Sequence, residues 1–550
     1  MSLASVSAQL IAALRHALTA EGLEPPDIAL QRPARAENGD LSTNVAFVMA
    51  RQARRPPVEL AKAIAGHVAE RRGEIAHLAR VEAVAPGFVN FYLAPTWLDD
   101  VLREVVTAGE ADYARHHVGQ GTRVDIEFVS ANPTGPLHAG AGRWAVYGDS
   151  LARVMERCGY EVEREYYLND QGTQMRLFGE SLAARRAGAE PPEGGYQGEY
   201  VSRWAADMPA DAEPVEWGYR RAVADAREVL ESLDIHFDTW FSERELYRKG
   251  AVDETLGLLV RSGSTYEHEG ATWLRTTPFG EDKDRVIVRS TGEPTYVLAD
   301  IAYHRDKLER GFDRLIDVLG ADHHGYVARL RAGLAALGYE TERLEVILGQ
   351  LVVLLREGQP VRLSKRAGDL VELRDVVDET GKDATRLTFL LQALDSAQTV
   401  DLAVMKAMTM ENPVYYVQYA HARIRSIERH AAELGIARPP LDGVDLTLLR
   451  DESELGILET LARLPDVTLS ACQARAPHAV VTWAREFADH FHAFYTRCRV
   501  TGEDIPPELT GARLWLIEAA RIGLALAFDL VGVTKVERME PVLANEPGRR

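Results

Sequence analysis

The sequence predicts a multidomain α/β protein in which a parallel-sheet domain stands between an N-terminal α+β domain and a C-terminal all-α helical bundle. A chain of 550 residues is too long for one hydrophobic core. Strand-like segments alternate with helical ones from about residue 116 to 400, which is typical of a mainly parallel sheet covered on both faces. From Asn412 to about residue 538 the apolar residues recur at helical spacing. We therefore predict a Rossmann-like domain followed by a helical bundle.

Three domains are predicted. Residues 1–115 contain an amphipathic helix, a turn at residues 38–40 and an alternating strand that includes Asn90. Residues 116–405 form the sheet domain, with an insertion around 185–280 whose first part is rich in Gly, Pro and acidic residues. Residues 406–550 form the helical bundle. The strands of the sheet are predicted at residues 124–128, 161–167, 286–288, 315–319 and 344–347.

The composition restricts the classes of function. Hydrophobic residues make up 46% of the chain and charged residues 27%, as in ordinary globular proteins. No run of 18 apolar residues and no signal-peptide pattern is present, so we expect a cytoplasmic protein that does not bind membranes. Three cysteines without a Cys-x-x-Cys pair exclude a disulfide framework and a cysteine zinc site. The net charge of −20 argues against coating of DNA, but it leaves room for docking of a folded RNA.

A strand, a loop and a helix follow one another between residues 124 and 155. The first residues alternate as in a strand, residues 129–142 are rich in Pro and Gly, and helical spacing follows. This order is typical of a nucleotide-binding corner, where loop amides and a helix N-terminus attract phosphate. His138 adds a donor to the loop. The alternative is a loop that only turns the chain.

Two pairs of residues could bind a cationic substrate. Glu127 and Asn132 lie at the end of the first strand, where side chains of a parallel sheet enter the ligand crevice. Tyr296 and Asp300 share one helix face, and a carboxylate beside an aromatic ring suits a guanidinium group. The structural alternatives are a solvated Glu127, and an Asp300 that caps a helix while Tyr296 lies in the core.

Two later loops carry histidines or basic residues. At Asp322-His323-His324, adjacent histidines diverge on a helix and no further ligand has suitable spacing, so we predict a substrate or nucleotide loop rather than a metal site. Residues 362–369 place three cations around a serine, and Lys365 could stabilise charge on triphosphate oxygens. A basic loop that is only solvated is the alternative. Near the start of the helical bundle, Tyr415, Tyr419 and Arg423 recur at helical spacing, which by itself indicates a helix and does not indicate RNA binding.

Taken together, these stretches resemble arginyl-tRNA synthetases, which are class I aminoacyl-tRNA synthetases. Residues 138–141 resemble the His-x-Gly-His signature, with Ala141 in place of the second histidine. Residues 362–365 resemble the Lys-Met-Ser-Lys signature, with Arg362 and Leu363 in place of its first two residues. The flanking and remaining stretches that match the family are residues 39–44, 86–90, 130–136, 143, 148–149, 295–304, 320–326 and 412–424.

The resemblance implies a role for each matching residue. ATP would contact Pro136, Leu137, His138, Gly140, Gly142 and Lys365, and the residues expected to act in catalysis are His138, Arg362, Ser364 and Lys365. Arginine would be held by Glu127, Ser130, Asn132, Tyr296, Asp300 and His323. The tRNA would contact Asn44, Asn90, Tyr415, Tyr419 and Arg423.

The implied reaction is a two-step ligation of L-arginine to tRNA(Arg) through arginyl-adenylate. ATP would be consumed with Mg²⁺ accompanying it, and no permanent metal is expected. We expect a monomer whose partners are tRNA(Arg), L-arginine and ATP, and not DNA. Ala141 and Trp144 favour one alternative, a synthetase-like paralogue with lost or redirected ligase activity. A nucleotidyltransferase without tRNA is a weaker alternative, because adenylate formation alone needs neither terminal domain.

Overall fold

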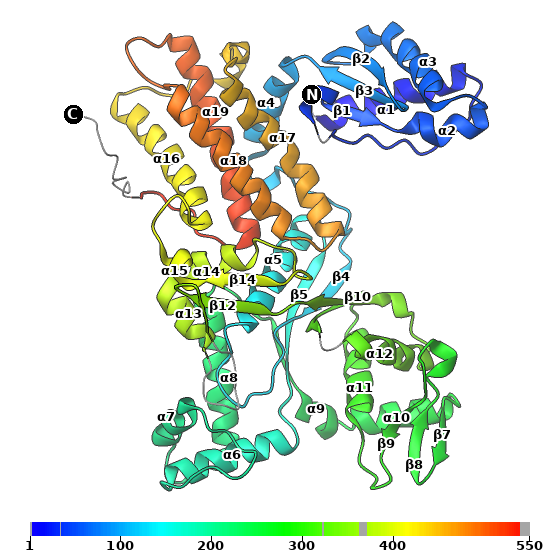
Figure 1. Ribbon diagram of the computed structural model, residues 1–550, viewed down its shortest axis with the longest axis vertical. Helices are drawn as coiled ribbons and strands as arrows, with labels where there is room; N and C mark the ends of the chain where they lie inside the picture. Colours follow the sequence, from blue (N-terminus) through cyan, green and yellow to red (C-terminus); the bar gives the residue numbers. More distant parts are fainter. Residues whose placement is uncertain (1–2, 34, 322–323, 362–370, 540–550) are drawn as a thin grey trace. The chain divides into compact units, whose positions relative to one another are not determined.

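The computed structural model describes residues 3–33, 35–321, 324–361 and 371–539 (Figure 1). The chain forms two compact units. Unit 1 consists of Met1–Tyr113, Ala420–Pro465 and Glu486–Leu526, and unit 2 consists of Ala114–Tyr419, Asp466–Arg485 and Ala527–Arg550. The division passes through the long helices near the C-terminus. The domain boundaries expected near residues 115 and 405 stay predictions.

The N-terminal part of unit 1 is an α+β fold around a three-stranded antiparallel sheet with the strand order β1-β3-β2. Its elements are α1 (Leu3–Ala20), β1 (Leu41–Thr43), α2 (Val45–Ala53), α3 (Pro57–Glu70), β2 (Leu78–Val84), β3 (Phe88–Leu93) and α4 (Thr96–Asp112). The apolar face of α1 is buried at Leu10, Leu14 and Leu18. Burial of such a face, rather than helix propensity, supplies most of the stability of a helix in a protein.

The central sheet of unit 2 has five parallel strands in the order β11-β10-β4-β5-β6. The strands are β4 (Arg123–Glu127), β5 (Glu161–Leu168), β6 (Thr239–Ser242), β10 (Arg314–Gly320) and β11 (Leu344–Gly349). Strand β4 is central, with β5 on one side and β10 on the other, so the strand order reverses at β4. A reversal of this kind opens a ligand crevice at the carboxyl ends of the strands. The parallel sheet confirms the predicted fold class.

One strand predicted for the parallel sheet lies elsewhere. Residues 286–288 belong to β9 (Arg285–Val288), which pairs antiparallel with β8 (Ala271–Leu274), and β8 pairs with β7 (Thr265–His268). A short apolar run indicates a strand but does not specify its partner, because the partner depends on contacts distant in sequence. The fifth strand of the parallel sheet is β6, which the sequence pattern did not predict.

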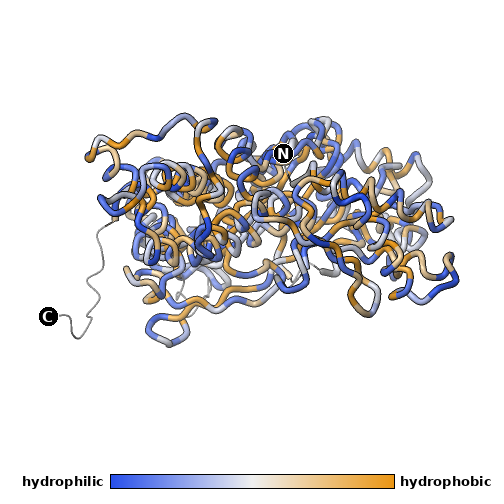
Figure 2. The backbone as a smooth tube through the Cα atoms, turned by 90° about the horizontal axis from the view of Figure 1, so that it is seen from above, coloured by the Kyte–Doolittle hydropathy of each residue, from blue (hydrophilic) through white to orange (hydrophobic). Residues whose placement is uncertain are grey.

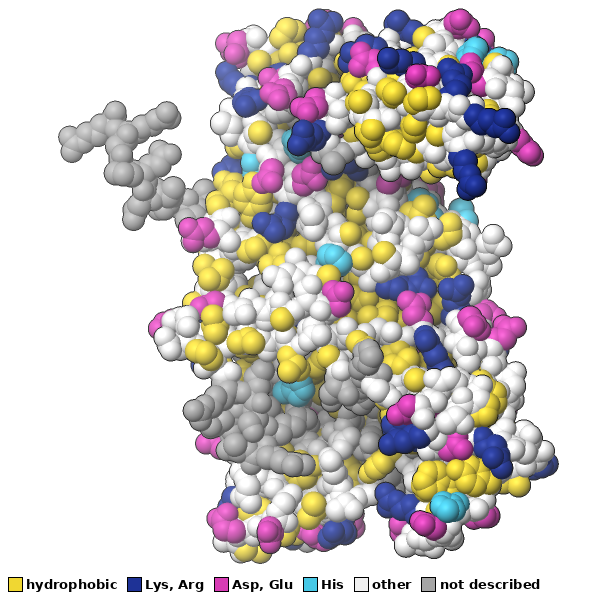
Figure 3. Space-filling model, turned by 45° about the vertical axis from the view of Figure 1, so that its right-hand side comes forward, with side chains coloured by type: hydrophobic (Ala, Val, Ile, Leu, Met, Phe, Trp, Pro, Cys, Tyr) yellow, Lys and Arg dark blue, Asp and Glu magenta, His cyan; other side chains and the backbone are white. Residues whose placement is uncertain are grey.

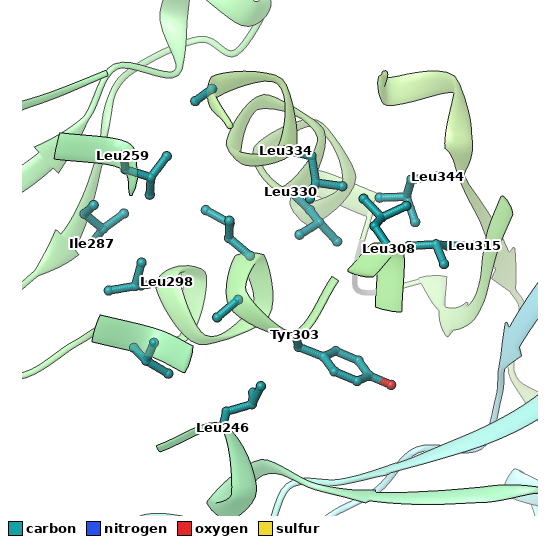
Figure 4. Close-up of a cluster of buried hydrophobic side chains, with 14 of the residues drawn as sticks. Leu246, Leu259, Ile287, Leu298, Tyr303, Leu308, Leu315, Leu330, Leu334 and Leu344 are labelled. Carbon is teal, nitrogen blue, oxygen red and sulfur yellow. The ribbon is translucent and has the colours of Figure 1, made fainter. Parts of the chain in front are cut away.

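Helices and a small second sheet complete the main part of unit 2. The helices are α5 (Ala141–Arg157), α6 (Thr173–Arg186), α7 (Glu199–Asp207), α8 (Pro214–Ser232), α9 (Glu243–Arg248), α10 (Ala251–Arg261), α11 (Tyr296–Glu309), α12 (His324–Ala336), α13 (Leu373–Thr380), α14 (Lys382–Phe389) and α15 (Leu402–Lys406). The sheet contains β12 (Val352–Arg356), β13 (Gln359–Pro360) and β14 (Gln398–Asp401). Figure 4 shows Leu298 and Leu308 of α11 in one buried cluster with Leu330 and Leu334. This cluster fixes α11, which carries several residues of the candidate site.

Four long helices occupy the C-terminal part of the chain: α16 (Pro413–Glu433), α17 (Glu452–Gln473), α18 (His478–Arg497) and α19 (Pro507–Val531). They confirm the predicted helical region. Hydrophobic and hydrophilic positions alternate along the chain (Figure 2), and none of the helices in the described ranges is long and apolar enough to cross a membrane. Figure 3 shows acidic and basic side chains interspersed on the visible face rather than gathered in one large field of a single sign.

Candidate functional site

A cavity of about 690 Å³ lies at the carboxyl end of β4 in unit 2. Its lining includes seven of the predicted site residues: Glu127, Ser130, Asn132, Leu137, His138, Tyr296 and Asp300. The structure therefore brings the loop after β4 and the start of α11 to one cavity, although more than 150 residues separate them in sequence. Pro136, Gly140 and Gly142 are near in sequence but are not among the lining residues. The predictions for His323, Arg362, Ser364 and Lys365 fall outside the described residues.

His138 is held by the first turn of α5. The backbone N–H of Ala141 donates to Nδ1 of His138 at 3.1 Å, so a neutral imidazole carries its proton on Nε2. His138 thereby offers an N–H donor beside the N-terminus of α5, whose backbone amides carry partial positive charge. This arrangement suits the phosphates of a nucleotide.

The chain that follows the predicted basic loop runs beside His138. The N–H of Ala139 donates to the carbonyl of Val371 at 2.9 Å, and the N–H of Leu373 donates to the carbonyl of Leu137 at 2.7 Å. His138 and Glu372 form an antiparallel β-bridge between these hydrogen bonds. The C-terminal flank of residues 362–370 is therefore tied to the loop that carries His138.

The two glycines of the first signature have different surroundings. A Cβ atom on Gly140 would lie 3.0 Å from Nδ1 of His138. A Cβ atom on Gly142 would lie 2.6 Å from Leu373 and 2.9 Å from Phe389, so Gly142 permits close packing of α5 against α13 and α14. The contact of each glycine with ATP stays a prediction.

Trp144 belongs both to the cavity wall and to the packing of the sheet. Its side chain lines the cavity, and a Cβ atom on Gly349, at the end of β11, would lie 2.3 Å from its Nε1. Ala141 lines the same cavity and is 4% exposed. Trp144 therefore lines the cavity and also packs against the end of β11.

Two carboxylates with raised pKa values line the cavity. Burial raises the pKa of Asp300 to about 7, and neighbouring carboxylates add to the effect. Burial also raises the pKa of Glu243 to about 7. Oε2 of Glu243 has no hydrogen-bond partner among the described residues, although this side chain is only 2% exposed. A buried acceptor without a donor suits a cationic ligand.

Tyr296 and Asp300 share a face of α11, as their spacing predicts, and both line the cavity. Tyr296 is 64% exposed, so its ring is not in the core. Glu243 is a site residue that the sequence interpretation missed. The available signal was an acidic residue placed directly after a strand that ends at the same sheet edge, but that strand, β6, was itself missed.

Glu127 has a partner inside the protein. Nζ of Lys307 lies 2.7 Å from Glu127, 2.8 Å from Asp125 and 3.4 Å from Asp317. Burial disfavours the charge of Lys307, but these carboxylates outweigh burial and hold its pKa well above the ordinary value. Burial alone would raise the pKa of Asp317, but Lys307 and His304 lower it to about 2. Lys307 thus offsets part of the negative charge of the carboxylates on β4 and β10, although burial still raises the pKa of Asp125 to about 7.

The residues predicted to contact tRNA have varied environments. In unit 1, Asn44 is exposed just before α2, whereas Asn90 is 3% exposed and accepts a hydrogen bond from Ser42 Oγ at 2.8 Å. Arg423 donates to the hydroxyl of Tyr495 at 2.9 Å. In unit 2, the rings of Tyr415 and Tyr419 stack with centroids 5.8 Å apart. Their contacts with tRNA stay predictions.

The parallel sheet and the histidine-bearing corner, with a second segment tied to it, are those of class I aminoacyl-tRNA synthetases. The catalytic-domain model "tRNA synthetases class I (R)" matches residues 105–189 and 217–415. The models "Arginyl tRNA synthetase N terminal domain" and "DALR anticodon binding domain" match residues 5–93 and 417–539. The chain belongs to the arginyl-tRNA synthetase family.

The sequences of individual relatives match this chain over nearly its whole length. The arginine–tRNA ligase of Syntrophotalea carbinolica is 46% identical and covers 94% of this chain and 95% of its own length. The arginine–tRNA ligase of Frankia alni is 44% identical, and the match covers 98% of this chain and 100% of the relative. The arginyl-tRNA synthetase structure of Thermus thermophilus has a TM-score of 0.76 at 22% identity, covering 96% of this chain and 99% of its own, and supports the fold.

Proposed function

We propose that this chain ligates L-arginine to tRNA(Arg) in two steps. The carboxylate of arginine attacks the α-phosphate of ATP to give arginyl-adenylate and pyrophosphate, and the terminal ribose of the tRNA then takes the arginyl group. The observation that carries the proposal is one cavity that joins a pair of desolvated carboxylates to a helix N-terminus with His138. Near-full-length relatives with this activity support it.

The geometry divides the work between two ends of the cavity. Asp300 and Glu243 would accept hydrogen bonds from the guanidinium, with the ring of Tyr296 beside it. His138 and the amides at the start of α5 would hold phosphate oxygens and stabilise the charge that develops as the α-phosphate is attacked. The protein thus positions the reactants and forms no covalent bond to them. Lys365, Ser364 and Arg362 are proposed to act from the second loop.

Mg²⁺ is proposed to enter with ATP. No group of three or more His, Cys, Asp or Glu side chains within the described ranges could hold a metal ion. We further propose that residues 1–115 contact the elbow of the tRNA, that residues 116–405 are the catalytic domain, and that residues 406–550 bind the anticodon. A cytoplasmic monomer is part of the same proposal.

The test is aminoacylation of total tRNA with each labelled amino acid in turn. Arginine should be attached and the other amino acids should not. Loss of both carboxylates in Asp300→Asn/Glu243→Gln should abolish attachment while tRNA binding stays unchanged. Absence of arginine attachment by the parent protein, with measurable tRNA binding, would support the paralogue instead.

The near-full-length ligase relatives do not favour the paralogue, although Ala141 replaces the second histidine of the signature. Loss of one charge-stabilising donor costs about 2.7–4 kcal/mol, roughly a hundred- to thousand-fold in kcat. We expect a slow but genuine ligase. Ala141→His should raise the rate constant of adenylate formation measured in a single turnover. An unchanged rate in an active parent would show that another group already supplies the interaction.

A further inference from the structure

Helix α7 contacts the loop before His138 and the residue before α13, Glu372, although it lies in a part of the chain that the family model leaves unmatched. The catalytic-domain model matches residues 105–189 and 217–415, and α7 spans Glu199–Asp207 between those stretches. In Figure 1, α7 lies beside α6 and α8. Nothing in the reaction itself requires a helix at this place, so its contacts need an explanation.

Tyr200 of α7 holds the loop before His138. Its hydroxyl donates to the carbonyl of Thr134 at 2.9 Å, and its side chain is buried. A Cβ atom on Gly135 would lie 2.7 Å from the Tyr200 ring, so the ring lies directly against the loop backbone. This contact satisfies a buried carbonyl and limits movement of residues 134–135.

Arg203, one turn further along α7, holds the segment after the second loop. Its Nη2 donates to Oε1 of Glu372 at 2.9 Å. Glu372 is also the N-cap of α13, where it forms a capping box with Asp375, and its backbone pairs with His138. Arg203 therefore acts on the residue that links α13 to His138.

Helix α7 is itself firmly packed. Tyr200 and Trp204 lie in a buried cluster with Phe178 and Leu182 of α6, and Trp204 is fully buried. The rings of Tyr200 and Trp204 pack edge to face, with their centroids 5.4 Å apart. A helix anchored in this way can hold Thr134, Gly135 and Glu372 in fixed positions, because packed side chains resist displacement.

We propose that α7 is a positioning element for the nucleotide corner, in which Tyr200 and Arg203 set the spacing of Thr134–Gly135 and Glu372 around His138. The proposal rests on the proposed function, since it concerns the binding of ATP in that reaction. Neither side chain touches the substrate. Both act through the loops that they hold, so their loss should affect ATP more than arginine.

The test compares full-length variants in arginine-dependent ATP–pyrophosphate exchange with tRNA present. Arg203→Ala should raise the KM for ATP about three- to five-fold, as expected for a partly exposed ion pair, and leave the KM for arginine unchanged. Tyr200→Phe should raise the KM for ATP by a similar factor, because the buried carbonyl of Thr134 loses its donor. Arg203→Lys should restore most of the parent value. Arg176→Ala removes an arginine of similar exposure, 60% against 56%, that pairs only within α6, and should change nothing.

A double-mutant cycle with Glu372→Gln separates positioning from general destabilisation. If Arg203 acts through Glu372, the double variant should be no worse than Arg203→Ala alone, with an unchanged unfolding midpoint. An unchanged KM for ATP in Arg203→Ala and Tyr200→Phe would overturn the proposal while leaving the ligase function intact. If the parent does not attach arginine, the proposed function fails, and calorimetric titration with Mg·ATP still decides whether the two variants bind it more weakly.

Discussion

Two groups of carboxylates meet at one cavity and have opposite environments. Asp125, Glu127 and Asp317 surround the buried ammonium of Lys307, which lowers the pKa of Asp317 to about 2, whereas burial still raises the pKa of Asp125 to about 7. Asp300 and Glu243 form no ion pair among the described residues, and burial raises the pKa of both to about 7, although His304 partly opposes this rise at Asp300. The first group stabilises the sheet beneath the cavity, whereas the second is prepared for a cation that comes from outside. The comparison separates structural acids from binding acids within one site.

Removal of Lys307 should have the largest effect on stability. Lys307→Met leaves three buried carboxylates without their cation, and the free energy of unfolding should fall by about 3–5 kcal/mol. Urea denaturation measures the change. Lys535→Met is the matched control: it removes an exposed pair with Asp529 and should cost less than about 1 kcal/mol. Equal losses in the two variants would contradict the distinction between the two groups.

Removal of Asp300 should affect function instead of stability. Asp300→Asn should raise the KM for arginine by about 100-fold or more, because a charged partner of the guanidinium is lost. Its free energy of unfolding should not fall, since a desolvated carboxylate has been removed. Glu293→Gln, which alters an exposed carboxylate shortly before α11, should leave arginine binding unchanged. Destabilisation by Asp300→Asn would place Asp300 with the structural acids.

Lowering the pH below about 7 should weaken arginine binding and should increase the contribution of these carboxylates to the stability of the ligand-free protein. Below about pH 7 Asp300 and Glu243 take up protons, so the KM for arginine should rise by up to about ten-fold per pH unit for each carboxylate that must ionise. The folded protein binds more protons than the unfolded chain between about pH 4 and 7, so the contribution of these groups to stability falls as pH rises through that window. KM measurements from pH 5.5 to 8.5 test the first effect. Asp300→Asn should flatten the profile, and an unchanged slope in that variant would contradict the assignment.

Glu127 belongs to both groups, because it lines the cavity and pairs with Lys307. Glu127→Gln should therefore affect both properties modestly, with a smaller loss of stability than Lys307→Met, about 1–2 kcal/mol, and a smaller rise in the KM for arginine than Asp300→Asn, less than about ten-fold. The amide oxygen can still accept from Lys307, and two carboxylates remain beside it. A KM increase as large as that of Asp300→Asn would show that Glu127 binds the substrate directly despite its internal partner.

Local patterns in the sequence predicted much of this site. The alternation before residue 129 and the loop that follows predicted the corner at His138, since neighbouring residues build it. The spacing of Tyr296 and Asp300 predicted a shared helix face for the same reason. Residues 286–288 were assigned to the wrong sheet, because an apolar run specifies a strand but not its partner.

Long-range contacts account for what the sequence did not reveal. Lys307 and Tyr200 carry no local signal, and the signal at Glu243 depended on the strand β6, which was missed; each of the three derives its role from residues distant in the chain. The partner of Glu127 could not be predicted either, because Lys307 follows it by 180 residues. Contacts at that separation depend on how the strands and helices pack.

By itself the sequence determined the family and the fold class, because both follow from residue types at short spacing, and it predicted the chemistry of the two signature loops. The tertiary structure alone decided which acids are neutralised and which remain open to a cation. It also decided that α7 contacts both Thr134, in the loop before His138, and Glu372, which pairs with His138. The physical reason is burial: a carboxylate acquires its charge state from the groups that surround it after folding, and those groups come from strands and helices far apart in the chain.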